Sequence, residues 1–222
     1  MEDFTSFFFI LICASVFYIY LENKASDVTY VSLNNIEFLV RNLPDKEEAA
    51  LLLSKIRERL SNIVDHCCKE IIDAKEDLKK IDETKKTHND SLKRMKKNFK
   101  PNNITESSPG NKYTSYSINK GEKIVFCLRA KDGTDKLVDI NTMMFVAIHE
   151  LAHLMTKSIG HTTEFWDNMR FLLKEGIKIK VYTHQNFNNN PVDYCGTKIT
   201  DTPLTILNLF SINILMSFYI LN

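Results

Sequence analysis

Two histidines four residues apart, His149 and His153, are the residues of this sequence best suited to chemistry. Residues four apart in an α-helix lie on one face, one turn apart, so both imidazoles can point at the same position. Glu150 flanks that position, where it can act on a metal-activated water without binding the metal itself. His161, brought back by a turn at Gly160, is the preferred third ligand. The pattern predicts one zinc ion per chain, with a coordination position left open for catalysis.

Other interpretations of these residues stay open. Glu164 and Asp167 are alternative third ligands because both follow the first two histidines closely, and Cys195 could bind a metal through its thiolate. The two histidines could also be unrelated residues on a helix surface. The apolar run 141–148 argues against that interpretation, because it predicts a buried helix in which neutral histidines need partners.

A zinc site of this kind predicts hydrolysis of peptide bonds. Zinc lowers the pKa of its water and polarises the scissile carbonyl, while Glu150 takes the proton and returns it to the leaving amine. Tyr194 is the candidate donor to the developing oxyanion, with an ordinary packed tyrosine as the alternative. A substrate can pair with an edge strand as an added strand. The segment 123–129 is the candidate edge, and Val125 and Cys127 are the expected substrate contacts.

We expect a small α+β domain over residues 113–203 to position these groups, with a short mixed sheet packed on the histidine-bearing helix. Alternating apolar residues predict strands, and three- and four-residue spacing predicts helices. The expected elements are strands at 114–118 and 123–129, a helix capped by Asp139, Asn141 or Thr142 and ending near Lys157, a helix from Thr162 or Thr163 to Lys174, and a strand at 177–182.

The N-terminal half is expected to be helical over residues 25–100, followed by a linker at 101–112. From Lys46 to Ile81, apolar residues recur at helical spacing, which predicts one long helix or two hinged ones. Part of this stripe should face the catalytic domain, and a small coiled coil with another chain is the alternative.

Residues 4–21 are 18 uncharged, mainly apolar residues within an expected membrane anchor at 1–24. At a rise of about 1.5 Å per residue they nearly span a bilayer core of about 30 Å. The acidic flank argues against a cleaved signal peptide. We therefore expect a single-pass membrane protein. The apolar segment 204–222 could be a second membrane segment or a buried helix.

The net charge is +1, which is close to zero and therefore argues for neither a nucleic-acid nor an acidic partner. Residues 79–100 nevertheless carry nine basic and three acidic side chains. This run could contact nucleic acid or an anionic membrane, although a solvated helix end is the commoner interpretation. The five cysteines have no framework spacing, which favours mostly free thiols.

The stretch His149-Glu-Leu-Ala-His153, with Gly160-His161-Thr-Thr-Glu-Phe165-Trp166, resembles the signature of WLM and SprT-like metallopeptidases, which are zincins. Residues 114–129, 139–153 and 191–196 more closely resemble predicted WLM-like metallopeptidases of giant DNA viruses. The loop between His153 and His161 is two residues longer than in typical WLM members. The resemblance implies a zincin fold, zinc and a protein or peptide substrate. WLM and SprT-like relatives cleave proteins crosslinked to DNA.

The resulting hypothesis is a membrane-anchored zinc metallopeptidase in which Glu150 is the general base. The resemblance implies a viral or host internal membrane as its location. We do not carry over the DNA-crosslinked substrate, because a membrane anchor fits poorly with a chromatin role. Two alternatives remain: a non-catalytic zinc-binding structural protein of a membrane or virion, and a DNA-associated protease acting on DNA-bound proteins through the 79–100 run. An intact Glu150 argues against the structural protein, since a structural zinc site has no use for that carboxylate.

Overall fold

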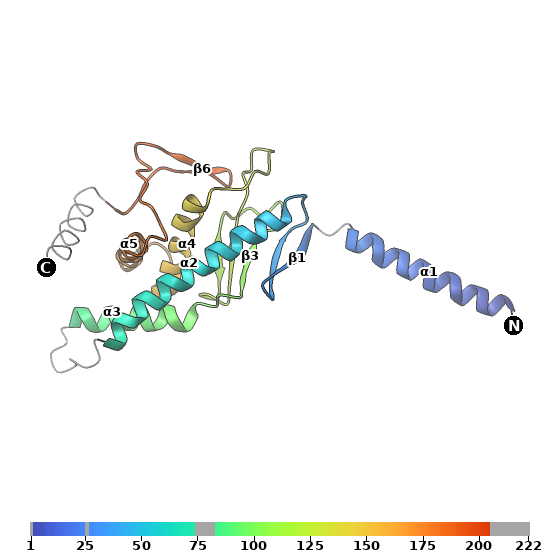
Figure 1. Ribbon diagram of the computed structural model, residues 1–222, viewed down its shortest axis with the longest axis horizontal. Helices are drawn as coiled ribbons and strands as arrows, with labels where there is room; N and C mark the ends of the chain where they lie inside the picture. The colour runs from blue at the N-terminus through green and yellow to red at the C-terminus, as the bar shows by residue number, and fades with distance from the viewer. Residues whose placement is uncertain (1, 25–26, 74–82, 205–222) are drawn as a thin grey trace.

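The protein is an α+β structure, seen in a computed structural model that describes residues 2–24, 27–73 and 83–204. A ribbon view shows α2 running across the body beside α4 and the small sheet, with α3 at one end (Figure 1). The elements are α1 (Glu2–Lys24), β1 (Val28–Leu33), β2 (Ile36–Arg41), α2 (Lys46–Asp73), α3 (Glu83–Asn98), β3 (Ile104–Glu106), β4 (Tyr116–Ile118), β5 (Lys123–Phe126), α4 (Ile140–Met155), α5 (Thr163–Lys178), β6 (Val192–Tyr194) and β7 (Thr197–Ile199).

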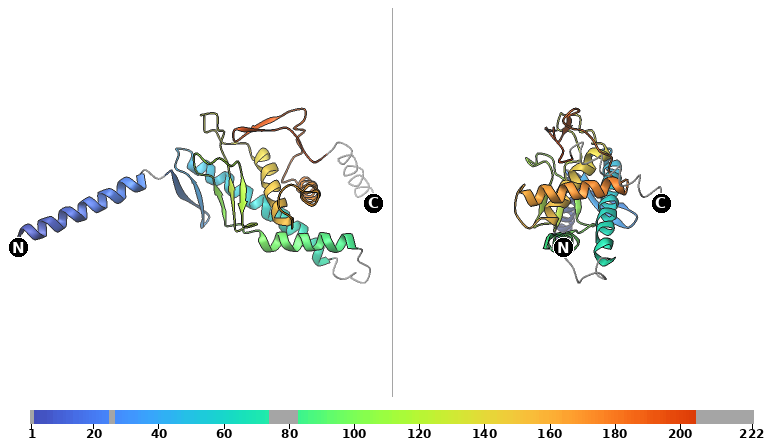
Figure 2. Two further views of the ribbon diagram at one scale, coloured as in Figure 1. Left: turned by 180° about the vertical axis from the view of Figure 1, so that it is seen from behind. Right: turned by 90° about the vertical axis from the view of Figure 1, so that its left-hand side faces the viewer.

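The core forms where α2, α3 and α5 pack around α4, which carries the two histidines. On α2, the side chains of Leu53, Ile56, Leu60 and Ile63 are fully buried. Their helical spacing gives α2 one apolar face, and that face packs on α4 within the same chain. The ribbon of α2 runs alongside that of α4 (Figure 2). Over the described part of α2, this confirms the expectation that part of the stripe faces the catalytic domain, and these four residues are used within the chain rather than in a coiled coil.

The main sheet has the strand order β3-β5-β4, with β3 parallel and β4 antiparallel to β5. The expectation that 123–129 is an edge strand is therefore wrong, because β5 lies between two neighbours. Val125 and Cys127 are buried, at 5% and 3% exposure, and are not available to pair with a substrate strand. The segment 101–112 contains β3, so it is not only a linker. Its strand is short and polar, which hid it from a search for apolar alternation.

Residues 28–41 form a β-hairpin rather than part of a helical region. Leu33 pairs with Ile36, and the two residues between them, Asn34 and Asn35, both have positive φ. Two left-handed residues make the turn type that matches the twist of paired strands, and asparagine tolerates this conformation well. The hairpin packs against α2 through Phe38 and Val40, so it extends the core.

The strand expected at 177–182 is wrong, because α5 continues to Lys178. Gly176 lies within α5, although glycine is a poor helix former. A Cβ built at Gly176 would be 3.3 Å from Ile148 and 3.6 Å from Ile63. The missing side chain therefore lets α5 approach α4 and α2 closely, and packing outweighs the roughly 1 kcal/mol by which glycine is inferior to alanine in a helix.

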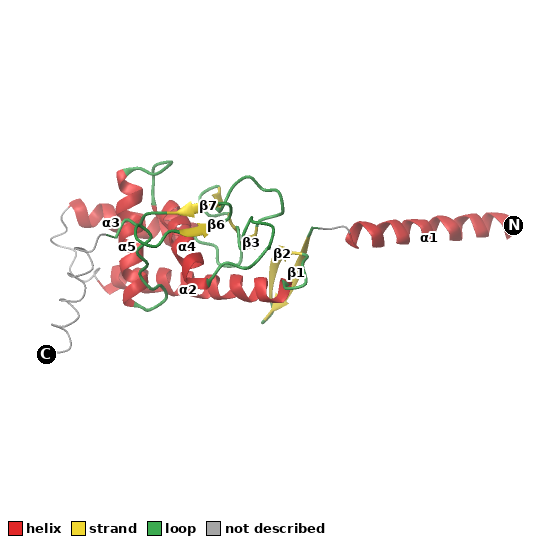
Figure 3. Ribbon diagram, turned by 90° about the horizontal axis from the view of Figure 1, so that it is seen from above, coloured by secondary structure: helices red, strands yellow, loops and turns green. Residues whose placement is uncertain are grey.

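The helix α1 extends away from the body of the molecule (Figure 3). Its side chains from Phe7 to Tyr20 are exposed. Across the described ranges of the chain, no helix is both long enough and apolar enough to cross a bilayer. The expected membrane anchor at residues 4–21 is therefore not supported. The apolar segment expected at 204–222 lies, apart from Leu204, outside the described residues.

A disulfide joins Cys127 and Cys195, while Cys13, Cys67 and Cys68 are free, so the expectation of mostly free thiols holds for three of the five cysteines. The two residues are 68 positions apart, so their pairing follows from the tertiary fold and not from any local spacing. Cys127 follows β5, and Cys195 lies in the turn between β6 and β7. The bond therefore fastens the β6–β7 hairpin to the end of the central strand.

Replacing both Cys127 and Cys195 with serine should lower the free energy of unfolding by about 4 kcal/mol, because the bond closes a long loop in the unfolded chain. Urea unfolding of the oxidised wild type and the double variant measures this difference. Cys13→Ser, at an exposed free thiol, is the matched control and should change little. A double variant as stable as the wild type would show that the bond does not form in solution.

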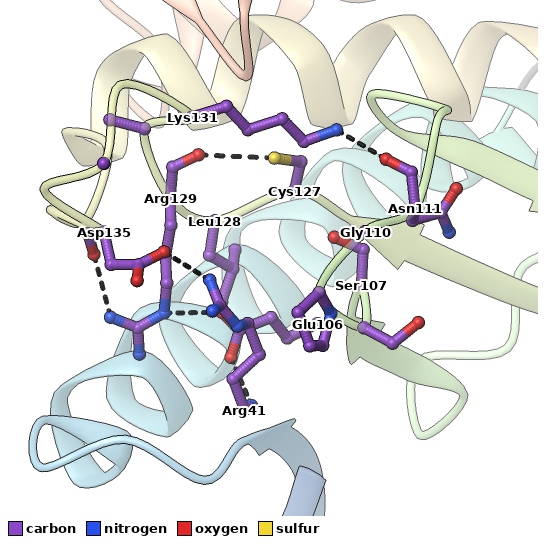
Figure 4. Close-up of a pocket in the computed structure, with 14 residues that line it drawn as sticks. Arg41, Glu106, Ser107, Gly110, Asn111, Cys127, Leu128, Arg129, Lys131 and Asp135 are labelled. Carbon is purple, nitrogen blue, oxygen red and sulfur yellow. Dashed lines mark hydrogen bonds and ion pairs between the residues drawn. The ribbon is translucent and has the colours of Figure 1, made fainter. Parts of the chain in front are cut away.

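A buried ionic network ties β2, β3 and the segment after β5 together (Figure 4). The Arg129 guanidinium donates to Glu106 at 2.8 Å and to Asp45 at 2.7 Å, and Glu106 also accepts from the Arg41 amide at 2.7 Å. Arg41 pairs with Asp135. Arg129 and Glu106 are each 3% exposed, so removing either partner would strand a buried charge. This network stabilises the sheet on the side where β3 meets β2.

Candidate metal centre

The helix α4 begins where Asp139 accepts hydrogen bonds from the backbone amides of Asn141 and Thr142, at 2.9 and 3.0 Å. This cap satisfies amides that otherwise lack partners and fixes the first turn. Most of α4 is buried, including the apolar residues from Met143 to Ile148. Because the rest of the helix is held by the core, the partly exposed face near its C-terminal end presents His149 and His153 in a fixed direction.

The ring nitrogens of His149, His153 and His161 converge on one position. The Nε2 atom of His149 lies 3.2 Å from that of His153 and 3.1 Å from that of His161. An imidazole Nε2 has either one hydrogen to donate or one lone pair that accepts, so a single hydrogen bond at His149 cannot account for both approaches. Tetrahedral zinc with bonds of about 2.0–2.1 Å to nitrogen holds neighbouring ligand atoms roughly 3.3 Å apart. The three histidines brought together here therefore fit a zinc ion in their number, their ligand atoms and their spacing.

Burial keeps the ligand candidates neutral. Desolvation, with the neighbouring His153 and His161, lowers the pKa of His149 to about 3. Desolvation, with His161 and Lys120, lowers the pKa of His153 to about 4. At neutral pH both rings therefore have the unprotonated nitrogen that a metal requires.

The Glu150 side chain lies beside the three histidines, in the same cleft of the protein surface. Its side chain is 4% exposed, and burial raises the pKa of its carboxyl to about 7. Among the described residues, no hydrogen bond engages this carboxylate, so its oxygens remain available. A base with a pKa near the working pH can both accept and return a proton.

Phe165 forms an aromatic floor under the three histidines. Its ring centroid lies 4.9, 4.3 and 4.7 Å from those of His149, His153 and His161. Phe165 is fully buried, while Trp166 stacks obliquely beside His161 at 5.6 Å. In the sequence, these two aromatic residues belong to the family signature. The structure adds that they pack directly on the histidine rings and limit their rotation.

The loop that delivers His161 is held by the Lys120 ammonium. Its Nζ donates to the carbonyl oxygens of three successive residues, Thr156, Lys157 and Ser158, at 2.9, 3.0 and 2.7 Å. Lys120 itself has a positive φ of 55°, an uncommon conformation for a residue with a side chain. An ammonium group has three hydrogens, so all of its donors are used on this loop. Sequence analysis missed this role because Lys120 lies in a turn far from the histidines.

Glu164 holds the same loop from the other side. Its carboxylate accepts from the amides of Lys157 and Ser158, at 2.9 and 3.2 Å, and pairs with Arg94. Burial raises the pKa of this carboxyl, but the hydrogen bonds outweigh burial and bring it below its ordinary value. The Glu164 carboxylate is therefore used in hydrogen bonds to the backbone and is not placed as a metal ligand. The other alternative ligands are also engaged, Asp167 with Arg170 and Cys195 in the disulfide.

Lys120→Met should lower the affinity for zinc about 10- to 100-fold, the range measured for partners that orient metal ligands. The cause is loss of the three hydrogen bonds that fix the loop before His161. Competition with a chromogenic chelator measures the affinity. Lys123→Met is the matched control, since that ammonium lies in the same hairpin and donates no hydrogen bond to the described residues. Equal affinities for all three proteins would contradict the role given to Lys120.

The cleft in front of the histidines has a volume of about 410 Å³ and is lined by β4 residues on one side and the His161 loop on the other. Tyr194 is not among its lining residues. The Tyr194 side chain is 4% exposed, and its hydroxyl lies 2.6 Å from Oγ of Ser115, which does line the cleft. The predicted oxyanion donor is therefore one residue removed from the cleft.

The main-sheet strand that borders the cleft is β4. In the order β3-β5-β4 it is an edge strand, and among the described residues no strand pairs with its other side. Tyr116 and Ser117 of β4 line the cleft together with Glu150 and His153. An extended chain added to β4 would therefore pass directly over the histidines.

An α+β domain with this His-Glu-x-x-His helix and a third histidine is metallopeptidase-like. The WLM domain model matches residues 73–206, and the chain belongs to that family. It is 35% identical over 194 residues to an uncharacterized protein of Acanthamoeba polyphaga mimivirus, covering 86% of this chain and 92% of that protein. This similarity places the chain among the WLM-like proteins of giant DNA viruses.

Two further similarities are more partial. An uncharacterized protein of Invertebrate iridescent virus 6 is 33% identical over 69 residues, which is 31% of this chain and 38% of that protein. The crystal structure of Wss1 from Saccharomyces cerevisiae aligns with a TM-score of 0.34 and 24% identity, covering 44% of this chain and 77% of that chain.

Proposed function

We propose that the protein is a zinc-dependent metallopeptidase that hydrolyses peptide bonds of protein substrates. The observation that carries the proposal is one cleft that contains three converging histidine nitrogens and a buried carboxylate with no hydrogen-bond partner in the described part of the chain. His149, His153 and His161 would hold the ion. Zinc bound there supplies Lewis acidity, which activates water and polarises a peptide carbonyl.

The chemistry of the chain itself centres on Glu150. Its carboxylate accepts a proton from the attacking water and then donates that proton to the leaving amine. A structural zinc site would need no such group, so an unpartnered Glu150 favours catalysis over a purely structural role. Phe165 keeps the rings fixed during the reaction, and Lys120 and Glu164 keep the His161 loop in place.

The substrate would lie as an extended chain along β4. Backbone pairing with a strand edge is independent of sequence, so it suits a protease that acts on unfolded segments. Beside His149, a recess of about 260 Å³ is lined by Phe145, Trp166 and Met169. Its apolar walls would accept an apolar side chain next to the scissile bond.

Incubation of the zinc-loaded chain with a denatured protein tests the function. We expect new N-termini, found by mass spectrometry, with apolar residues enriched beside the cut, and complete inhibition by a zinc chelator. Cleavage that persists with the chelator present, or no cleavage of several unfolded proteins, would contradict the proposal.

A second candidate function is proteolysis on nucleic acid, favoured by one observation. Lys93, Lys96, Lys97 and Lys100 are exposed at the end of α3, which packs against α4. Lysines on one helix end can neutralise phosphates, and such binding weakens as salt rises. Binding of a duplex oligonucleotide at several salt concentrations separates the candidates. A steep salt dependence that Lys96→Gln with Lys97→Gln reduces would favour this one.

A further inference from the structure

Ser115 and Tyr194 meet behind the cleft, although they are 79 residues apart in the sequence. The Ser115 Oγ atom lies 2.6 Å from the Tyr194 hydroxyl and accepts a hydrogen bond from the Cys127 amide at 3.1 Å. Ser115 lines the cleft with His149 and Glu150, whereas Tyr194 is buried. Ser115 is therefore the hydroxyl of this pair that a substrate can reach.

The positions of the hydrogens follow from the donors available. A serine hydroxyl has one hydrogen and two acceptor lone pairs, and the Cys127 amide already uses one lone pair. Burial raises the pKa of the Tyr194 phenol above its usual range, so the phenol keeps its proton. The 2.6 Å contact allows either hydroxyl to be the donor. A phenol is more acidic than an aliphatic alcohol and is therefore the stronger hydrogen-bond donor, so Tyr194 is assigned as the donor to Ser115. Both lone pairs of the Ser115 oxygen then accept hydrogen bonds, and the Ser115 hydroxyl hydrogen remains free to donate to a group in the cleft.

We propose that the Ser115 hydroxyl is a catalytic hydrogen-bond donor to the substrate carbonyl oxygen, and that Tyr194 is the positioning residue that orients it. The inference rests on the proposed peptidase function. When the water oxygen bonds to the carbonyl carbon, the carbonyl π electrons move onto oxygen and the water proton goes to Glu150. Ser115 stabilises the resulting negative oxygen by a hydrogen bond and transfers no proton.

The disulfide fixes both members of this pair. Cys195 follows Tyr194 directly, and its partner Cys127 is the residue whose amide binds Ser115. Cys195 and Gly196 both have positive φ, so they form the tight two-residue turn of the β6–β7 hairpin. The covalent bond thereby holds Tyr194 against Ser115 at the end of β5. This arrangement gives the donor a fixed direction before substrate binds.

Four variants of the zinc-loaded full chain test the proposal, with zinc content measured so that all values refer to loaded protein. A phosphinic peptide serves as the probe because its tetrahedral group carries the negative oxygen of the addition step. Ser115→Ala should weaken its binding about 100-fold and lower kcat by a similar factor with little change in KM. Tyr194→Phe should cause a smaller loss of about tenfold, since the donor remains but is less well oriented.

Ser115→Thr keeps the hydroxyl and should restore most of the affinity that alanine loses. Thr197→Val is the matched control, because the Thr197 hydroxyl donates to the Tyr194 carbonyl on the outer side of the same hairpin. It should leave binding and kcat unchanged. If Ser115→Ala binds the phosphinic peptide as the wild type does, or Thr197→Val weakens binding as much as Tyr194→Phe, the proposal is overturned. If the variants change phosphinic-peptide binding as predicted but the wild type cleaves no peptide, only the proposed peptidase function is overturned.

Discussion

Glu150→Gln is expected to leave zinc binding intact and to reduce peptide hydrolysis about a thousandfold, within the range that general acid–base catalysis supplies. Glutamine has nearly the same shape, but its amide accepts no proton at neutral pH. Because no described residue bonds to the Glu150 carboxylate, the exchange breaks no protein contact. Steady-state cleavage of a fluorogenic peptide measures the rate, and elemental analysis measures the zinc.

The control for this variant is Glu58→Gln, which removes the same charge from an exposed position on α2. Its activity should match the wild type. A Glu150→Gln protein that retains zinc and also retains its rate would show that another group accepts the proton.

His161→Ala should reduce zinc affinity more than about 100-fold, because losing a ligand costs more than losing a residue that orients one. The result decides whether His161, rather than Glu164 or Asp167, completes the site. Cobalt substitution adds a direct readout, since the absorption spectrum reports the coordination number and geometry of the ion. The structure predicts that the spectrum of the variant differs from that of the wild type.

His184→Ala is the matched control, because His184 lies outside the cluster of the three histidines. Its zinc affinity should equal that of the wild type. Replacement of Glu164 gives a second comparison: if Glu164→Gln weakens zinc binding while His161→Ala does not, the carboxylate is the ligand and the loop adopts another arrangement when zinc binds.

The helix that carries the site was predictable because its determinants are local. Asp139 caps α4, the apolar run buries it, and the four-residue spacing places His149 and His153 on one face. Of the three expected N-cap candidates, Asp139 is the one observed, and the convergence of His149 and His153 with His161 is observed as well. These features depend on helix periodicity and a glycine turn, which a sequence displays directly.

The features that sequence analysis missed depend on contacts between distant segments. The Cys127–Cys195 bond and the Ser115–Tyr194 contact bring the β6–β7 hairpin to the central strand, and no local spacing records either one. The edge strand was misassigned because β3 lies within a polar stretch that resembles a linker. Once β3 occupies one side of β5, the free edge passes to β4 and moves beside the histidines.

The most direct test of zinc-dependent catalysis is a titration of the metal-free full chain with zinc while the cleavage of an unfolded protein is followed. The account predicts no cleavage without zinc, and a rate that rises in proportion to added zinc until it levels at one ion per chain. Cleavage by the metal-free chain, or tight binding of one zinc without any cleavage, would contradict it.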